Sequence, residues 1–297
     1  MRSRGADSAV CRLPLPARVL SLDPSARSRH WLSQGDQHGL NLQIESAVGP
    51  AELAEHVPSK VLRQLEALLV PEALKQARKG LGIWATNHRF LASVANSNAT
   101  TLFLEDDTLL TPSFCTHTTR ALRTIASLPT WDLLLPGHCG GVRDRNCSRI
   151  LGTTSNFPLY VTRGLYPMCT HAYIVSPRGA ARMHALLTGW PQAYAASVLR
   201  TAKPGWETTG VPRGRRPTKR PVDDMHDVAV AKLVFTGQLE AYPMWPQAAL
   251  QPWMVSRPHK GGLALGTADR GVPSVCKRSC SQKQNVVAGL PCDFSPK

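Results

Sequence analysis

Three adjacent carboxylates, Glu105-Asp106-Asp107, follow a short apolar stretch at 101–104. An apolar run of this length is typical of a strand that is covered on both faces, as in a parallel sheet. Because side chains alternate along an extended chain, Glu105 and Asp107 are predicted to face one way and Asp106 the other. Two such oxygen ligands can hold Mg²⁺ or Mn²⁺ and leave positions for a substrate diphosphate. The alternative for the same residues is a solvated acidic turn.

Predicted strands and helices alternate on both sides of this segment. Strands are predicted at 18–23, 42–45, 101–104, 131–135, 170–175 and 239–242. Helices are predicted within 51–79, where prolines interrupt the pattern, at 80–95, 112–128 and 178–187, and after 221. This order predicts an α/β fold with a mainly parallel sheet flanked by helices in a single domain, and ligands of such sheets bind at the carboxyl ends of the strands.

The predicted domain covers residues 18–257. Residues 1–17 are polar and rich in arginine and proline, which predicts a disordered N-terminal segment. A basic insertion at 201–220 is predicted to be a surface loop, and residues 258–297 read as a cysteine-containing tail without periodicity.

The composition is that of a globular protein with an excess of positive charge. The chain has 297 residues, of which 42% are hydrophobic and 19% charged. A formal charge of +15 indicates an anionic partner such as a nucleotide, a nucleic acid, an acidic glycan or a membrane surface. Part of this excess is local, because five basic residues lie within 213–220. No run of about 18 apolar residues is present, so no membrane span is expected.

The cysteines and the N-terminus point to different compartments. Eight cysteines and two glycosylation sequons, which begin at Asn98 and Asn146, favour the lumen of the endoplasmic reticulum or Golgi apparatus. Cys139 and Cys147 could close a short disulfide loop. The N-terminus lacks the continuous apolar segment of a signal peptide, which leaves the cytoplasm open as the alternative.

Several short segments, in order and spacing, carry a resemblance to a known family. Besides the acidic triplet they are Leu22-Asp23 with Arg27 and Arg29, Ala47-Val48, the helix that carries His88, 131–134, 172–176 with Gly179-Ala180, 221–223, and Pro246 with Gln251. Over residues 18–255 the chain resembles glycosyltransferase family 25, which contains lipooligosaccharide galactosyltransferases and procollagen galactosyltransferases. It departs from the family at Trp84 and Asn87, where cysteine and serine are usual.

The resemblance implies a fold of the GT-A type and a nucleotide-sugar donor. It implies that a hexose, galactose in the named members, passes from a UDP-sugar to a hydroxyl group of a glycan or protein with the help of Mn²⁺ or Mg²⁺. Asp107 would bind the metal directly, and Glu105 would act through water or the ribose. A metal there neutralises the diphosphate leaving group. Asp223 or Asp224 is the candidate base for the acceptor hydroxyl, and the alternative for this pair is an ordinary helix N-cap.

Four further residues are candidates for substrate binding. Arg29 and His88 match the family by position only, and the alternative for His88 is a core histidine on the apolar face of a helix. Tyr173 would either stack on the donor base or belong to the core. Gln251 would bind the donor or cap a loop.

Two other functions compete with glycosyl transfer. The first is a non-catalytic protein on the same fold that binds a polyanion or glycan, with the basic insertion as the binding element. The second is a metal-dependent phosphoesterase, which the lack of a dense set of histidine and aspartate ligands argues against. Nucleic acid is not the expected partner.

Overall fold

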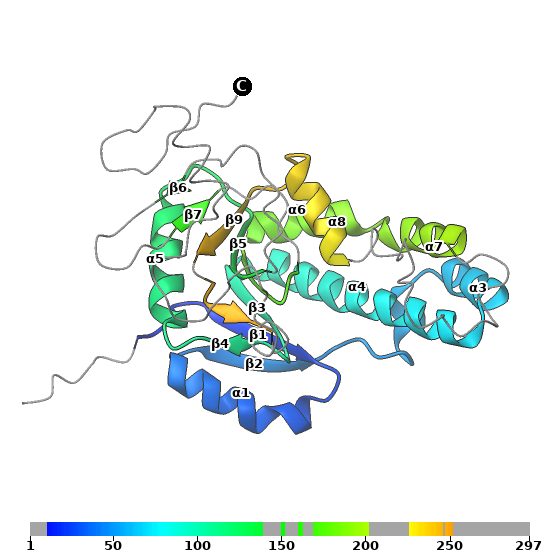
Figure 1. The fold of residues 1–297 in the computed structure, drawn as a ribbon, viewed down its shortest axis with the longest axis horizontal. Coiled ribbons are helices and arrows are strands. Elements are labelled where there is room, and N and C mark those ends of the chain that lie inside the picture. Colours follow the sequence, from blue (N-terminus) through cyan, green and yellow to red (C-terminus); the bar gives the residue numbers. More distant parts are fainter. Residues whose placement is uncertain are drawn as a thin grey trace, which may run out of the picture.

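The protein is described by a computed structural model that covers residues 11–138, 150–151, 160–162, 169–201, 226–245 and 247–251. It is an α/β fold, with helices on both faces of one large sheet (Figure 1). The predicted fold class is therefore confirmed at this level. Within the described residues, no helix is long and apolar enough to cross a membrane.

The sheet is mixed, with most of its strands running in one direction. Its strands are β1 (Pro16–Ser21), β2 (Asn41–Ser46), β3 (Thr101–Glu105), β5 (Leu133–Gly137), β6 (Ile150–Leu151), β7 (Tyr160–Thr162), β8 (Ala172–Val175) and β9 (Ala241–Trp245). Their order is β2-β1-β3-β8-β5-β9-β7-β6. In the first six positions only β8 runs against the others, because it pairs antiparallel with both β3 and β5. A separate antiparallel pair joins β4 (Leu109–Leu110) to β10 (Ala249–Leu250).

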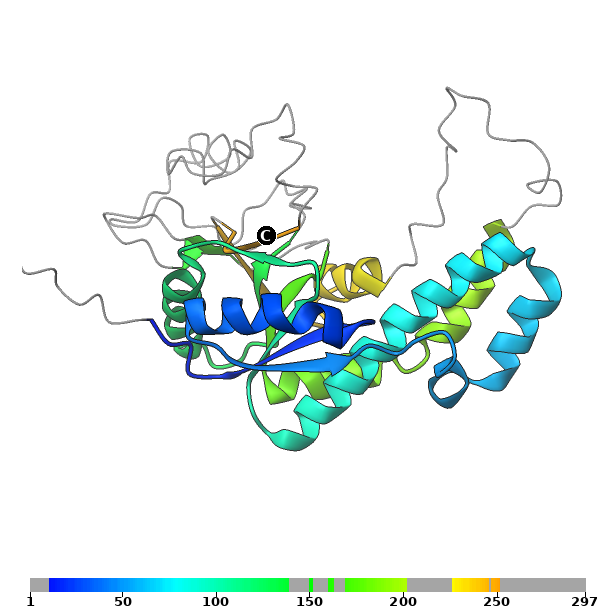
Figure 2. The same cartoon turned by 90° about the horizontal axis from the view of Figure 1, so that it is seen from below.

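The described residues contain eight helices. They are α1 (Pro24–His38), α2 (Leu53–His56), α3 (Ser59–Leu68), α4 (Pro71–Ser97), α5 (Phe114–Ala126), α6 (Pro177–Leu187), α7 (Trp190–Thr201) and α8 (His226–Phe235). Figures 1 and 2 show α3, α7 and the first half of α4 extending together beyond the sheet. The sheet and this helical extension meet at the carboxyl end of β1, which is where the candidate site lies.

Two hydrophobic cores lie on opposite faces of the sheet. In β3, Phe103 belongs to the core shared with α3, α4, α6, α7 and α8, whereas Leu102 and Leu104 belong to the core shared with α1 and α5. In β8, Tyr173 and Ile174 divide in the same way. Alternate residues of an extended strand point to opposite faces, so both strands must be apolar throughout. The prediction that 101–104 is covered on both faces is confirmed.

Helix α4 is longer than the sequence pattern predicts. The expected break near Gly80 does not occur, and one helix runs from Pro71 to Ser97. The break lies at Pro71, which occupies the first turn, where a missing backbone N–H costs nothing. Gly80 instead provides room for a neighbouring helix, because a Cβ atom at this position would overlap the hydroxyl group of Tyr194 in α7.

Ordered structure begins earlier than the predicted boundary at residue 18. Strand β1 starts at Pro16, and the side chains of Leu13 and Leu15 are buried. A disulfide joins Cys11 to Cys115 in α5 and ties this segment to the second core. The prediction of disorder is therefore wrong for residues 11–17. Residues 1–10, the tail 258–297, the pair Cys139 and Cys147, and the insertion 201–220 apart from Thr201 lie outside the described residues.

The start of α6 is held by a buried charge beneath it. Ser176 caps the helix, because its Oγ accepts the backbone N–H of Gly179 at 2.9 Å. The fully buried Asp132 accepts hydrogen bonds from Arg182 at 2.8 Å and from the backbone N–H of Glu240 at 2.9 Å, and it lies 3.7 Å from Arg178. Asp132 therefore links β5, α6 and the segment before β9.

We predict that Asp132→Asn lowers the free energy of unfolding by about 2 kcal/mol, because two arginines lose their shared buried counter-charge. Urea denaturation measures the effect. Asp36→Asn, on the exposed side of α1, is the matched control and should change stability by less than about 0.5 kcal/mol. Equal effects of the two substitutions would contradict the structural role of Asp132.

Candidate functional site

The acidic triplet lies at the carboxyl edge of three parallel strands. Strand β1 pairs with β2 on one side and with β3 on the other, and in this register Leu20 lies opposite both Glu45 and Glu105. The three strands therefore end at the same edge. Open α/β sheets bind their ligands at such an edge.

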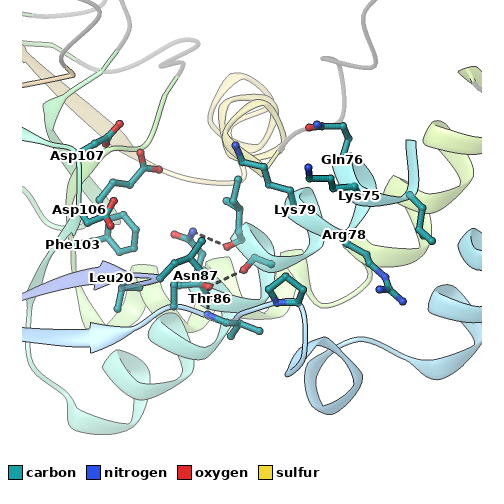
Figure 3. Close-up of a pocket in the computed structure, with 18 of the residues that line it drawn as sticks. Leu20, Lys75, Gln76, Arg78, Lys79, Thr86, Asn87, Phe103, Asp106 and Asp107 are labelled. Atoms are coloured by element: carbon teal, nitrogen blue, oxygen red, sulfur yellow. Dashed lines mark hydrogen bonds between the residues drawn. The ribbon is translucent and has the colours of Figure 1, made fainter. Parts of the chain in front are cut away.

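A cavity of about 830 Å³ opens at this edge, beside the carboxylates (Figure 3). Its walls come from the ends of β1, β2 and β3 and from one side of α4. Leu22, Pro50, Leu74 and Ile83 make much of the surface apolar. A cavity of this size, with apolar walls and a few convergent polar groups, is of the kind that binds a cofactor or a substrate of comparable volume.

A buried hydroxyl joins the two walls of the cavity. Oγ1 of Thr86 in α4 accepts the backbone N–H of Val48 at 2.8 Å and donates to the carbonyl oxygen of Gly82 at 2.7 Å. The first bond satisfies a buried backbone group directly after β2, and the second anchors the hydroxyl to its own helix. The position of α4 relative to the sheet edge is thereby set.

Glu105 is the most buried carboxylate of the site. Its Oε2 accepts a hydrogen bond from Nε2 of Gln251 at 3.1 Å. Burial is the largest cause that raises the pKa of Glu105 from 4.5 to about 7, and the negative charges of Asp107, Asp227 and Asp106 contribute the rest of this rise. The carboxylate thus lies where an additional positive charge would be strongly favoured.

Asp107 is more open to solvent than Glu105. Loss of solvent around its carboxylate still raises the pKa of Asp107, and the charge of Asp106 adds to this rise. The side-chain amide of Gln251 acts against the rise in the pKa of both Glu105 and Asp107. Gln251 therefore stabilises the charged form of both predicted metal ligands. It reaches them because β10, the short strand directly before it, pairs with β4, which follows Asp107 by two residues.

Asp106 has different partners from its two neighbours. Its carboxylate accepts the hydroxyl group of Ser21 at 2.5 Å and lies 3.9 Å from Nε of Arg27. Its backbone carbonyl accepts the indole N–H of Trp31 at 3.2 Å. These contacts hold it against β1 and α1, although it also lines the cavity. Asp106 therefore differs from Glu105 and Asp107 in its partners. Because β3 ends at Glu105, this difference arises in the turn that follows the strand and not from the alternation of side chains along it.

The two carboxylates are suited to share a metal ion with a substrate. Among the described residues, no group of three or more histidine, cysteine, aspartate or glutamate side chains is placed to hold one. Glu105 and Asp107 therefore need further ligands from a substrate or water. The charge of Asp107 raises the pKa of Glu105 and that of Asp106 raises the pKa of Asp107, so a cation at this site would be favoured, and oxygen ligands suit Mg²⁺ and Mn²⁺.

His88 lies away from the cavity, between α4 and α6. Its ring stacks on that of His184, with centroids 3.8 Å apart, and on that of Trp84 at 4.7 Å. Burial lowers the pKa of His88 to about 4. The position predicted for substrate binding therefore carries a packed, neutral histidine at the helix interface.

Trp84 and Asn87, which depart from the pattern of the family that the sequence resembles, have structural roles in the same region. The indole N–H of Trp84 donates to the carbonyl oxygen of Leu187 at 2.9 Å, and its ring stacks on Trp190. The amide of Asn87 donates to its own helix at Ile83, and its Oδ1 accepts the hydroxyl group of Tyr173 at 2.9 Å. Both side chains thus satisfy buried polar groups around α4.

Tyr173 belongs to the core rather than to the cavity wall. Its side chain is 1% exposed, and its ring stacks on that of Phe103 in the neighbouring strand, with centroids 4.5 Å apart. Burial raises the pKa of its hydroxyl well above 10. Tyr173 contributes to the site through Asn87, which lines the cavity.

The remaining predicted residues lie elsewhere on the chain. Arg29 is exposed on α1 and does not line the cavity, whereas Arg27 approaches Asp106. Asp223 and Asp224 lie outside the described residues. Asp227 in the first turn of α8 acts electrostatically on Glu105 and was not predicted, although its carboxylate follows the Asp223-Asp224 pair closely in the sequence.

The side of α4 that lines the cavity was also not predicted from the sequence. It presents Lys75, Lys79, Ile83 and Thr86, at spacings of three or four residues that place them on one helical face. This spacing was visible in the sequence. The expected break at Gly80 divided the face between two helices and concealed it.

Comparison with known proteins adds no assignment to this geometry. No protein-family model matches the chain, and no curated protein matches it.

We predict that metal-free protein loses stability as pH rises from 4.5 to 7, in part through Glu105. The folded state keeps the proton on Glu105 up to about pH 7, whereas the unfolded chain releases it near pH 4.5, so unfolding releases a proton in this window. Glu105→Gln should remove up to about 3 kcal/mol of this loss. Urea denaturation at several pH values in EDTA measures it.

Glu55→Gln, on the exposed side of α2, removes the same charge away from the cavity and is the control. If Glu105→Gln and Glu55→Gln give parallel curves of stability against pH, Glu105 does not titrate abnormally.

Proposed function

We propose that this chain is a metal-dependent glycosyltransferase with a fold of the GT-A type. It would transfer a hexose, galactose by resemblance to glycosyltransferase family 25, from a UDP-sugar to a hydroxyl group of a glycan or protein. The observation that carries the proposal is the gathering of Glu105, Asp107 and Gln251 at the carboxyl end of β3, beside a largely apolar cavity of about 830 Å³. A nucleotide-sugar needs both an apolar surface for its nucleoside and a cationic centre for its diphosphate.

The residues of the site would divide the work between them. Glu105 and Asp107 would hold Mn²⁺ or Mg²⁺, which when bound neutralises the charge that builds up on the diphosphate leaving group. Gln251 orients Glu105 through its 3.1 Å hydrogen bond. Leu22 and Pro50, which follow β1 and β2 in the sequence, offer an exposed apolar surface to the nucleoside. Excluding water from this surface strengthens the electrostatic interactions at the carboxylates.

A base for the acceptor hydroxyl would come from the segment before α8. Asp223 and Asp224 remain our candidates, and such a carboxylate has to lie within hydrogen-bond reach of the attacking hydroxyl. The influence of Asp227 on Glu105 supports this choice, because it shows that the first turn of α8 lies near the carboxylates. The base and the metal ligands would then come from segments far apart in the sequence.

The disulfide supports an oxidising compartment for this activity. Cytosolic proteins rarely keep disulfides, whereas proteins of the secretory lumen commonly do. The Cys11–Cys115 bond joins the first described residue to α5. We therefore propose the lumen of the endoplasmic reticulum or Golgi apparatus over the cytoplasm.

We predict that UDP-galactose or UDP-glucose raises the melting temperature of the protein only when Mn²⁺ is present. A ligand at one hundred times its dissociation constant stabilises the folded state by about 2.7 kcal/mol. Asp107→Asn should abolish this stabilisation, because it removes a metal ligand. A thermal-shift assay with and without Mn²⁺ makes the measurement, and assays of sugar transfer follow with the UDP-sugar that binds.

Asp106→Asn is the matched control, since it removes a neighbouring charge that is held by Ser21 and Arg27. It should keep the Mn²⁺-dependent shift even if the melting temperature of the free protein falls. The proposal fails if no UDP-sugar stabilises the wild-type protein with Mn²⁺. If Asp107→Asn and Asp106→Asn lose the Mn²⁺-dependent shift equally, the roles within the triplet are assigned wrongly.

A further inference from the structure

The cavity has a second charged end, opposite the carboxylates. Lys75 and Lys79 lie one turn apart on the side of α4 that lines it. Figure 3 shows both side chains leaving α4 towards the side of the cavity where Asp106 and Asp107 lie, whereas Arg78 points the other way. The cavity thus has acidic groups at one end and two lysines that extend towards them from α4.

These two lysines have no protein counter-charge in the part of the chain that the structure describes. The acidic side chains nearest to them in the sequence are engaged elsewhere, since Glu66 forms an ion pair with Arg78 and Glu72 accepts a hydrogen bond from Gln76 at 3.3 Å. Neither lysine makes a described hydrogen bond or ion pair. Both are therefore available to a ligand.

Both lysines are exposed to solvent where they line the cavity. Pro50, Pro71 and Leu74 line the cavity near them and present only apolar side chains. An anion bound between these lysines would keep contact with water, so dissolved salt weakens its attraction to them.

The separation of the two ends sets the kind of ligand that could reach both. Asn87, which accepts the hydroxyl of Tyr173, lies on the part of α4 beside Phe103 and Glu105. At 1.5 Å per residue, about 12 Å of helix separates Lys79 from Asn87 and about 18 Å separates Lys75 from it. The backbones of the lysines therefore lie two to three turns of α4 from Asn87, and their side chains extend back towards the carboxylates.

We propose that Lys75 and Lys79 form an anion subsite, which binds a carboxylate, sulfate or phosphate group of the substrate along the first half of α4. The part of this inference that separates the anion from the diphosphate rests on the proposed function. The anionic group has two possible sources, the acceptor glycan or the sugar of the donor. Both offer the same chemistry to the lysines.

Calorimetric titration of the full chain with two pairs of ligands tests the subsite. The donor pair is UDP-glucuronate and UDP-glucose, each with Mn²⁺, and the acceptor pair is 3′-sulfated lactose and lactose without metal. Within each pair the members differ mainly by one anionic group. We expect the wild-type protein to bind the charged member of one pair at least about tenfold more tightly than the neutral member, and the pair that shows this identifies the source.

The variant Lys75→Gln/Lys79→Gln should abolish this preference and leave the affinity for the neutral member unchanged. Lys60→Gln/Arg63→Gln removes the same charge from exposed positions of α3 that do not line the cavity, and it should keep the preference. Raising the salt concentration should reduce the preference in the wild-type protein.

Three results would overturn the subsite. The first is that the wild-type protein shows no preference for either charged ligand. The second is that the two double variants lose this preference equally. The third is that Lys75→Gln/Lys79→Gln loses affinity for UDP-glucose and UDP-glucuronate equally, which would place the lysines on the diphosphate. Failure of the proposed function is distinguishable from these results. It would appear as no Mn²⁺-dependent binding of either UDP-sugar, and the metal-free sulfated ligand would still decide the subsite.

Discussion

Burial of β3 between two helical layers is the constraint on which the candidate site depends. Phe103 packs into one core, and Leu102 and Leu104 pack into the other, so a shift by one residue would exchange these side chains between the cores and disrupt the packing of both. This register brings Glu105 opposite Leu20 of β1. The first polar residues after β3 therefore emerge at the common edge of three parallel strands, beside the cavity.

The charges at this edge are only partly balanced by the protein. Asp106 is held by Ser21 and Arg27, whereas Gln251 offers Glu105 and Asp107 a neutral amide. The two remaining carboxylates consequently have raised pKa values, and a cation would relieve this cost. Sites of function often carry such an imbalance, because a fully neutralised site would gain little from binding a ligand.

Around α4, side chains that were candidates for chemistry act in packing. His88 stacks between Trp84 and His184, and Tyr173 stacks on Phe103 while bonding to Asn87. Their types could not distinguish the two roles in advance, since histidine and tyrosine each combine an apolar ring with a polar atom. Which role they take depends on the face of the helix or strand that meets a neighbour. For α4 the continuous helix through Gly80 decides this, because α7 packs closely there.

The sequence alone determined the alternating order of strands and helices, the burial of β3 on both faces and the position of the acidic triplet at its end, because these depend on local periodicity. Tertiary structure decided the reversed strand β8, the ordered start before β1 and the identity of the cavity wall, because each depends on contacts between distant segments. It also separated Asp106 from its neighbours. Gln251 and Glu105 are 146 positions apart in the sequence, and no local pattern predicts a contact over that separation.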